Sequence, residues 1–273
     1  MSIVNTLSLE SNRQIKINFN GGDLSSDAGL LLIKEFVSKL GIDRLFSHSF
    51  KTNDSALFRY HTDKANLLQM IYMIIAGYFE DDASDELTND PVFKTVLEKD
   101  TLASQPTVSR FFNRMDEDTL NQFLAIERIL RKRIYSIQMP EAVVLDLDST
   151  LLEAYGKQEG RAFNFHFQSN VYYPLVCYDG ITGDLIKILL RDGTRYSCTG
   201  VVDFLQPIWD EYLVDELDDI TRENKVDYAL VYGEFMYQAA SWPYERRVVC
   251  KVEKPENQMT YIYTFIVTNM DSS

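Results

Sequence analysis

The sequence predicts a mixed α/β (α+β) protein in which an N-terminal helical region precedes a region built largely from strands. The first observation is that apolar residues between positions 27 and 135 recur at the spacing of amphipathic helices. The second is that short apolar runs of strand length follow one another after Met139-Pro140. We therefore expect a helical region over 1–138 and a β-rich region over 139–273.

The helical region should begin with one short strand. Residues 15–19 alternate between apolar and polar, and Gly21-Gly22 ends that pattern. Apolar residues crowd the segment 63–78, so a helix there should be buried on most sides. Ser104 and Pro106 are typical of a helix start. The expected helices cover residues 27–40, 63–78, 91–97, 104–114 and 118–135.

The β-rich region opens with a continuous apolar run over 142–147, which predicts a buried strand. A loop containing Gly156 and Gly160 should follow. Two further runs, 172–178 and 185–190, flank a turn sequence and predict a hairpin. Helices are expected over 200–212 and 214–224, and strands over 228–236, 246–253 and 261–269.

The composition limits which classes of protein the chain can belong to. The formal net charge of −14 opposes a nucleic-acid partner, because phosphate binding needs Lys and Arg, although local charge can differ from the total. The three cysteines, Cys177, Cys198 and Cys250, form no CxxC pair, which indicates free, buried thiols. The N-terminus lacks an apolar signal core, and the most apolar stretch, 67–79, is too short to span a bilayer. We therefore expect a cytoplasmic protein without a membrane partner.

The sharpest candidate for chemistry is the pair Asp146 and Asp148 in the sequence DLDST. Alternation along a strand puts both carboxylates on one side, at the end of the strand. Two close carboxylates repel each other unless a cation or a proton relieves them, and Mg²⁺ prefers carboxylate oxygens. The alternative is that the pair only caps the following turn.

Two other groups are weaker candidates. His166 lies in NFHFQ, and a lone histidine among aromatic residues is more typical of a packed residue than of a catalyst. Arg110 and Arg114 are four residues apart on the expected helix 104–114, so they share a face. That face is either solvated or a contact to DNA within a helical pair.

Longer stretches carry a more specific signal. They are FNGGDLSSDAGLLLIKEF, SQPTVSRFFNRM, VVLDLDSTLLEAYGKQEGRAFNFHFQ, YYPLVCYDGITGDLI, VYGEFMYQAASWPYERRVVCKVE and TFIVTNMDSS. In this order they resemble the DDE transposases of bacterial insertion sequences, in the group called DDE transposase group 1.

The resemblance implies an N-terminal DNA-binding and dimerisation region followed by an RNase H-like catalytic core. Three acidic residues of that core hold two divalent ions, Mg²⁺ or Mn²⁺, which activate water and then a DNA 3′-hydroxyl for attack on a phosphodiester. The D-S-T step maps the first catalytic aspartate onto Asp148, with Asp146 as its companion in metal binding. The implied partners are the terminal inverted repeats of the element and a second copy of the chain, without a small-molecule cofactor.

The chain departs from the family pattern at the other two acids. No D-S-G-F motif occurs, and residues 207–213 run directly into the expected helix 214–224. A second gap is expected between Leu230 and Val231. The final glutamate belongs to a helix after TFIVTN, where this sequence stops. We therefore expect an incomplete core from a truncated, internally deleted remnant that is catalytically defective. Asp215, Asp218 and Asp219 are poor substitutes, because they fall on a predicted helix.

Three interpretations remain open on the sequence. The chain is a transposase, active or formerly active; or it is a non-catalytic DNA-binding or dimerising fragment that interferes with intact transposase; or it is an inert product that folds badly. The lost core strand would expose sheet edges and apolar faces, which favours aggregation.

Overall fold

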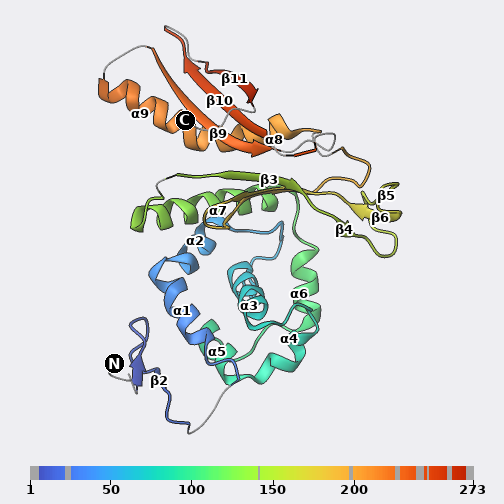
Figure 1. The fold of residues 1–273 in the computed structure, drawn as a ribbon. Helices are drawn as coiled ribbons and strands as arrows, with labels where there is room; N and C mark the ends of the chain where they lie inside the picture. The colour runs from blue at the N-terminus through green and yellow to red at the C-terminus, as the bar shows by residue number, and fades with distance from the viewer. Residues whose placement is uncertain are drawn as a thin grey trace. The chain divides into compact units, whose positions relative to one another are not determined.

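The computed structural model describes residues 6–21, 26–140, 142–196, 199–224, 228–237, 243–244, 246–256 and 260–268. The chain divides into two compact units, Met1–Met139 and Pro140–Ser273, which Figure 1 shows in one view. Helices and strands are both well represented, so the predicted α/β class is confirmed. Each unit is described by itself below.

The first unit is helical, with a small antiparallel ribbon of two strands at its start. Most of its predicted elements are confirmed, and α2 and α4 were not expected. Its elements are β1 (Thr6–Ser8), β2 (Lys16–Asn18), α1 (Leu30–Lys39), α2 (Ile42–Ser49), α3 (Asp63–Ala76), α4 (Ala83–Glu86), α5 (Pro91–Leu97), α6 (Gln105–Phe112) and α7 (Glu117–Ile137).

Local chemistry explains where these helices begin. The Asp90 carboxylate accepts hydrogen bonds from the amides of Val92 and Phe93, which caps α5. Asp116 and Thr119 form a reciprocal capping box at α7. Ser104 holds the N-cap position of α6 as predicted, but its hydroxyl contacts the Thr107 hydroxyl and makes no capping bond to a backbone amide.

The helical unit has its own core around α3. Tyr72 is 1% exposed, and Phe93 and Phe111 are fully buried beside it in the same cluster. Gln69 of α3 is also buried, and its amide makes two 2.8 Å hydrogen bonds with the backbone of Ala103. These bonds hold the segment that leads into α6, because both polar groups of a buried amide need partners.

The second unit is built on a six-stranded sheet with the order β11-β10-β9-β3-β7-β8. Strands β3, β7 and β8 form an antiparallel meander, and β9 lies parallel to β3 on the other side. β9, β10 and β11 continue as a second antiparallel meander. The bounds are β3 (Leu145–Ser149), β7 (Leu175–Asp179), β8 (Leu185–Leu189), β9 (Ala229–Tyr237), β10 (Arg246–Lys254) and β11 (Ile262–Thr268).

Helices α8 (Val201–Trp209) and α9 (Asp215–Asn224) cover one face of this sheet (Figure 1). A π-helical turn, Asp210–Val214, joins them into one run. Trp209 packs on Phe265 of β11 with ring centroids 4.4 Å apart. A Cβ on Gly233 of β9 would lie 3.0 Å from Leu213 Cδ1, so a larger residue there would require the Leu213 side chain to shift where the π turn approaches the sheet. The two predicted helices are therefore confirmed, but as one joined run.

One prediction for this unit is wrong. The expected loop after β3 contains a second, three-stranded sheet with the order β4-β6-β5. Its strands are β4 (Leu152–Glu153), β5 (Ala162–Asn164) and β6 (Ser169–Tyr172). The strands are too short for alternation to be visible in the sequence, and Gly156 and Gly160, both with positive φ, turn the chain between β4 and β5.

Cys177 and Cys250 are fully buried, as predicted, and burial raises the pKa of the Cys250 thiol to about 12. Cys198 lies outside the described residues. Among the described residues, no helix is both long and apolar enough to cross a membrane.

Candidate functional site

The acid pair lies on β3 with both carboxylates on the exposed face. Burial alternates along the strand: Leu145 and Leu147 enter the core under α8 and α9, whereas Asp146 and Asp148 are exposed. Residues two apart on a strand are roughly 7 Å apart, so the two side chains are neighbours on one surface. The shared face of the two acids is as predicted, but the strand is Leu145–Ser149 instead of 142–147, so Asp146 lies near its start and only Asp148 near its end.

In the part of the sheet that the structure describes, no acid is paired with Asp146 or Asp148 on a neighbouring strand. Tyr178 of β7 is paired with Asp146, and Val176 is paired with Asp148. On the other side, Met236 of β9 is the partner of Asp146. Asp148 Oδ1 accepts a 2.7 Å hydrogen bond from the amide of Ser149. On the β7 side, an aromatic residue is therefore the register partner of Asp146 and an apolar residue that of Asp148.

The next acid on β9 is Glu234, two residues before Met236. The Arg247 guanidinium on β10 binds Glu234 Oε2, with the Nε–Oε2 distance at 2.7 Å. The parallel register puts Glu234 roughly 13 Å along the strands from the level of Asp148. Glu234 is therefore too far away, and already engaged, to act with Asp148.

Among the described residues no group of three or more His, Cys, Asp or Glu side chains is arranged to hold a metal ion. Asp218 lies on α9 and binds Lys254 Nζ at 2.9 Å and the Tyr261 hydroxyl at 2.7 Å. These bonds, first the one from Lys254, lower the pKa of the Asp218 carboxyl. The side chains of Asp215 and Asp219, the other two substitutes considered, lie outside the described residues.

Arg191 is a structural residue near the acid pair that sequence reasoning missed. Its side chain is buried, and its guanidinium donates to the Ser149 hydroxyl at 2.8 Å and to the carbonyls of Tyr173 and Thr199 at 3.0 and 2.9 Å. It therefore ties the end of β3 to the approach to β7 and to the segment before α8. No local sequence signal marks it, because its partners are mostly backbone carbonyls.

The two candidate DNA contacts differ in their surroundings. Arg110 is exposed near the end of α6. Arg114 follows the helix and points inward, where its Nη2 binds Asp63 Oδ1 at 3.3 Å and its Nε lies 3.2 Å from Thr52 Oγ1. Asp63 also accepts two bonds from Thr52, so this cluster joins the start of α3 to the end of α6.

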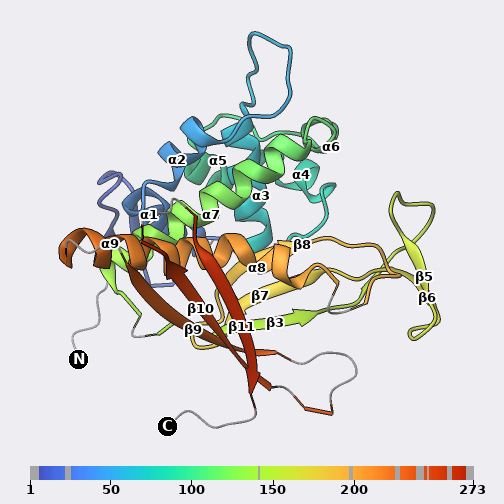
Figure 2. The same cartoon turned by 90° about the horizontal axis from the view of Figure 1, so that it is seen from above.

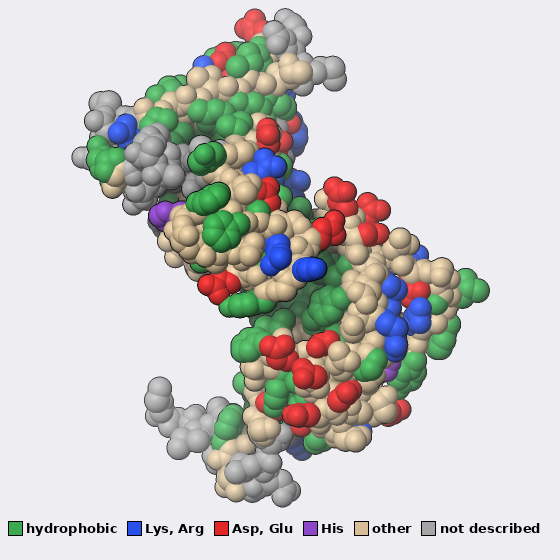
Figure 3. Space-filling view, turned by 90° about the vertical axis from the view of Figure 1, so that its right-hand side faces the viewer, with side chains coloured by type: hydrophobic (Ala, Val, Ile, Leu, Met, Phe, Trp, Pro, Cys, Tyr) green, Lys and Arg blue, Asp and Glu red, His purple; other side chains and the backbone are tan. Residues whose placement is uncertain are grey.

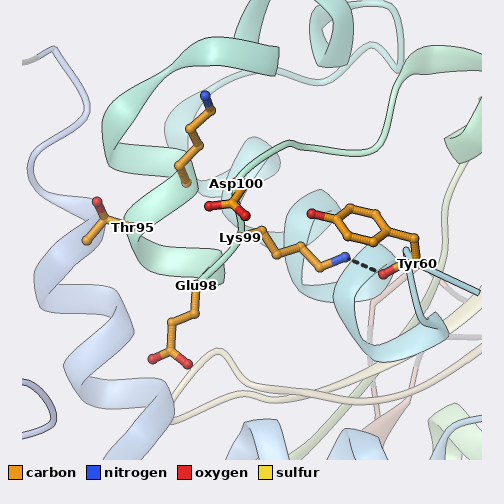
Figure 4. Close-up of a pocket in the computed structure, with 6 residues that line it drawn as sticks. Tyr60, Thr95, Glu98, Lys99 and Asp100 are labelled. Atoms are coloured by element: carbon orange, nitrogen blue, oxygen red, sulfur yellow. Dashed lines mark hydrogen bonds between the residues drawn. The ribbon is translucent and has the colours of Figure 1, made fainter.

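A pocket in the helical unit lies at the end of α5 and has a volume of about 560 Å³. Figure 4 shows that its side chains diverge: Lys99 turns to the Tyr60 carbonyl at 3.0 Å, while Glu98 points away. Burial, followed by the charge of Lys64, lowers the pKa of the Lys99 ammonium. Because the polar groups do not converge on one point, the pocket has the features of a surface hollow.

Charge is unevenly distributed on the helical unit. Figure 3 shows one group of acidic side chains and a separate group of Lys and Arg side chains on the face that it draws. Residues 80–86, which include α4, are rich in exposed acids. The net charge of the whole chain therefore does not describe every part of its surface.

The family comparison gives the class of the protein. A family model described as Transposase DDE domain group 1 matches residues 7–217 and 211–273. The chain therefore belongs to the group 1 DDE transposases, a family that generally uses divalent metal ions and whose members bind DNA. Neither the curated proteins nor the solved structures contain a match to the chain.

Proposed function

We propose that this chain is a catalytically defective insertion-sequence transposase that binds the terminal inverted repeats of its element without cutting them. The observation that carries the proposal is the isolation of Asp146 and Asp148: both acids lie on one strand, and within the described register neither neighbouring strand pairs an acid with them. The family supplies the DNA partner, and the missing acids remove the chemistry.

The sheet unit supports an origin from an RNase H-like core. The meander β3-β7-β8 is followed by a helical run and then by β9, which is parallel to β3 and adjacent to it. A helical crossover of this kind between parallel strands is the usual way to place a second acid beside the first at the same edge of a sheet. Here β9 occupies that position and carries Phe235, Met236 and Tyr237.

The joined helices support an internal deletion. The two matched segments of the family model overlap at residues 211–217, which is where the π-helical turn joins α8 to α9. π turns accommodate irregular spacing within a helix. We infer that the strand with the second aspartate has been lost at the junction between α8 and α9. The second expected gap, between Leu230 and Val231, falls inside the continuous strand β9.

The metal chemistry of the family does not fit the residues described here. Two-metal catalysis needs acids that bridge two ions ~4 Å apart, held from more than one direction. Asp146 and Asp148 provide two carboxylates from one direction, which suits a single hydrated cation at most. We therefore assign no catalytic step to this centre.

Interference with intact transposase is the second candidate function. The helical unit has a closed core of its own, so it can fold and occupy DNA or a partner copy without the catalytic centre. Such a chain would lower the activity of an intact relative by competing for the same ends.

The test is an electrophoretic shift assay with the DNA ends that flank this gene, alongside random duplex of equal length. The proposal expects tighter binding to the terminal ends, and it expects that adding the chain slows cleavage by an intact family member. Equal binding to both DNAs, with no effect on the relative, is the result that contradicts it.

A further inference from the structure

The small sheet after β3 carries an unusual surface. We call residues 152–173, which contain β4, β5 and β6, the aromatic excursion. The excursion leaves the main sheet at the end of β3 and returns at the start of β7, where the Thr150 amide donates to the Pro174 carbonyl at 3.1 Å. Figure 2 shows the small sheet standing out beyond the ends of these strands.

The tip of the excursion is aromatic where a turn is normally polar. The turn between β5 and β6 reads Phe165-His166-Phe167-Gln168, whereas turns favour Gly, Asn, Asp and Pro. Phe165 is 81% exposed, and Phe163, His166 and Phe167 are exposed as well. The expectation that His166 is a packed residue is therefore wrong, because the turn carries it into solvent.

Hydrogen bonds fix this turn in shape. Asn164 Oδ1 accepts from the amides of His166 and Phe167, and Gln168, which has a φ of 54°, donates its side-chain amide to the Phe165 carbonyl. Asn164 also donates to the Gly193 carbonyl at 2.6 Å. The rings are thus presented by an ordered backbone, which reduces the entropy cost of binding with them.

Phe165 is the most exposed ring of the tip, whereas Phe167 is 36% exposed and also contacts Tyr173 with centroids 5.8 Å apart. Phe163 and Phe165 meet edge to face, with centroids 5.3 Å apart and planes at 82°. His166 and Phe167 do the same at 4.7 Å and 81°. Edge-to-face pairs leave flat ring faces that can receive a further aromatic group.

The charge and the position of the excursion favour DNA bases as the aromatic groups that these rings receive. The excursion has two acids, Glu153 and Glu159, and two bases, Lys157 and Arg161, which cancel in a chain of net charge −14. DNA is therefore repelled less here than by the average surface. The six residues from Ser169 to the start of β7 span about 20 Å, so the tip can contact DNA roughly six base pairs from the level of Asp148.

We propose that Phe165 and Phe167 stack on unpaired bases of the element's DNA end, roughly six base pairs from the acid pair. Stacking uses the flat faces that every base offers, so it needs no sequence motif. The inference rests on the proposed function, which supplies DNA as the partner, and adds the residues and the state of the DNA that they bind.

The experiment uses the full chain with two DNAs: a terminal-repeat duplex, and the same duplex with a six-nucleotide unpaired gap carrying 2-aminopurine. The double variant Phe165→Ala/Phe167→Ala should bind the gapped DNA about 5- to 150-fold more weakly for each stacked base and lose the 2-aminopurine quenching. Phe165→Trp should keep both. Ile181→Ala, at an exposed position in the β7–β8 turn, is the matched control and should leave binding unchanged.

Equal binding of gapped DNA by the wild type and the double variant, with the wild type binding terminal DNA, overturns the stacking proposal alone. Failure of the wild type to bind any DNA overturns the proposed function and this inference together. If sedimentation shows a dimer of the wild type that the double variant lacks, with equal DNA binding, the rings bind a second copy, and stacking is again overturned.

Discussion

Two pairs of aspartates, one in each unit, have opposite surroundings. In the helical unit, Asp54 binds Arg59 through both carboxylate oxygens, at 2.7 and 2.9 Å, and Asp63 binds Arg114 at 3.3 Å. In the sheet unit no described cation forms an ion pair with Asp146 or Asp148. The first pair holds ion pairs within the fold, and the second pair is exposed to solvent.

On our proposal, the contrast shows how a chain can lose its catalytic function and keep its scaffold. The side chains beneath Asp146 and Asp148, which include Leu145 and Leu147, still pack into an intact core. Catalysis requires acids from separate segments to meet, whereas the fold requires only that each segment bury its apolar face. Loss of one strand can therefore remove the chemistry without removing the sheet.

The largest expected effect is a difference in stability between variants of the two aspartate pairs. Asp63→Asn should lower the free energy of unfolding by about 1–3 kcal/mol, because it removes the carboxylate that accepts from the buried Thr52 and leaves Arg114 with only the longer 3.5 Å ion pair to Asp54. Asp148→Asn, the matched change, should stay within about 0.5 kcal/mol of the wild type. Urea unfolding measures both, and equal losses in the two variants would break the comparison.

Metal binding should depend on the pair in the sheet unit, Asp146 and Asp148. Calorimetry with Mn²⁺ should show one site with a Kd on the order of 10⁻⁴–10⁻³ M, since only two carboxylates and water are offered. Asp148→Ala should abolish the heat, while Asp184→Ala, at an exposed acid of the β7–β8 turn, should not. Two tight sites would contradict the incomplete centre.

The pH dependence of stability tests the ion pair between Asp54 and Arg59 in the helical unit. The hydrogen bond from Arg59 is the largest cause that lowers the pKa of the Asp54 carboxyl below its ordinary value of 3.8. A lowered pKa means that the unfolded state binds the proton more strongly, so this stabilisation is present above about pH 4 and is lost as the pH falls further. Between pH 5 and pH 2.5, the free energy of unfolding should decline less steeply in Asp54→Asn than in the wild type. Arg59→Ala should flatten the decline similarly, and an unchanged slope in both would contradict the pairing.

The smallest expected effect is a change in DNA binding. Arg110→Ala should weaken binding to terminal DNA a few-fold and reduce the salt slope by about 0.9, as expected for one lost phosphate contact. Its stability should not change, because Arg110 is exposed. An Arg110→Ala protein with the wild-type salt slope would remove this residue from the DNA contact.

Much of the fold could be predicted from the sequence, because periodicity records which face of an element is buried. The helices α3, α5, α6 and α7 and the strands β9, β10 and β11 lie where the apolar patterns indicate them. The small sheet β4-β6-β5 could not be predicted, since two- to four-residue strands are too short to carry a period and depend on pairing.

The candidate site was predictable only in part. Alternation along β3 is sufficient to put Asp146 and Asp148 on one face, and the structure agrees. The inward turn of Arg114 was not visible, because its partners Thr52 and Asp63 are distant in the sequence. Arg191 was missed for the same reason.

The most direct test of the central claim is Mn²⁺-dependent nicking of a supercoiled plasmid that carries the two DNA ends flanking this gene. An intact family member provides the positive control, and Asp146→Asn/Asp148→Asn the negative one. We predict that the purified chain binds the ends and leaves the plasmid supercoiled, as the double variant does. Nicking at the element ends by the wild type, lost in the double variant, would contradict the account and show that a complete catalytic centre forms.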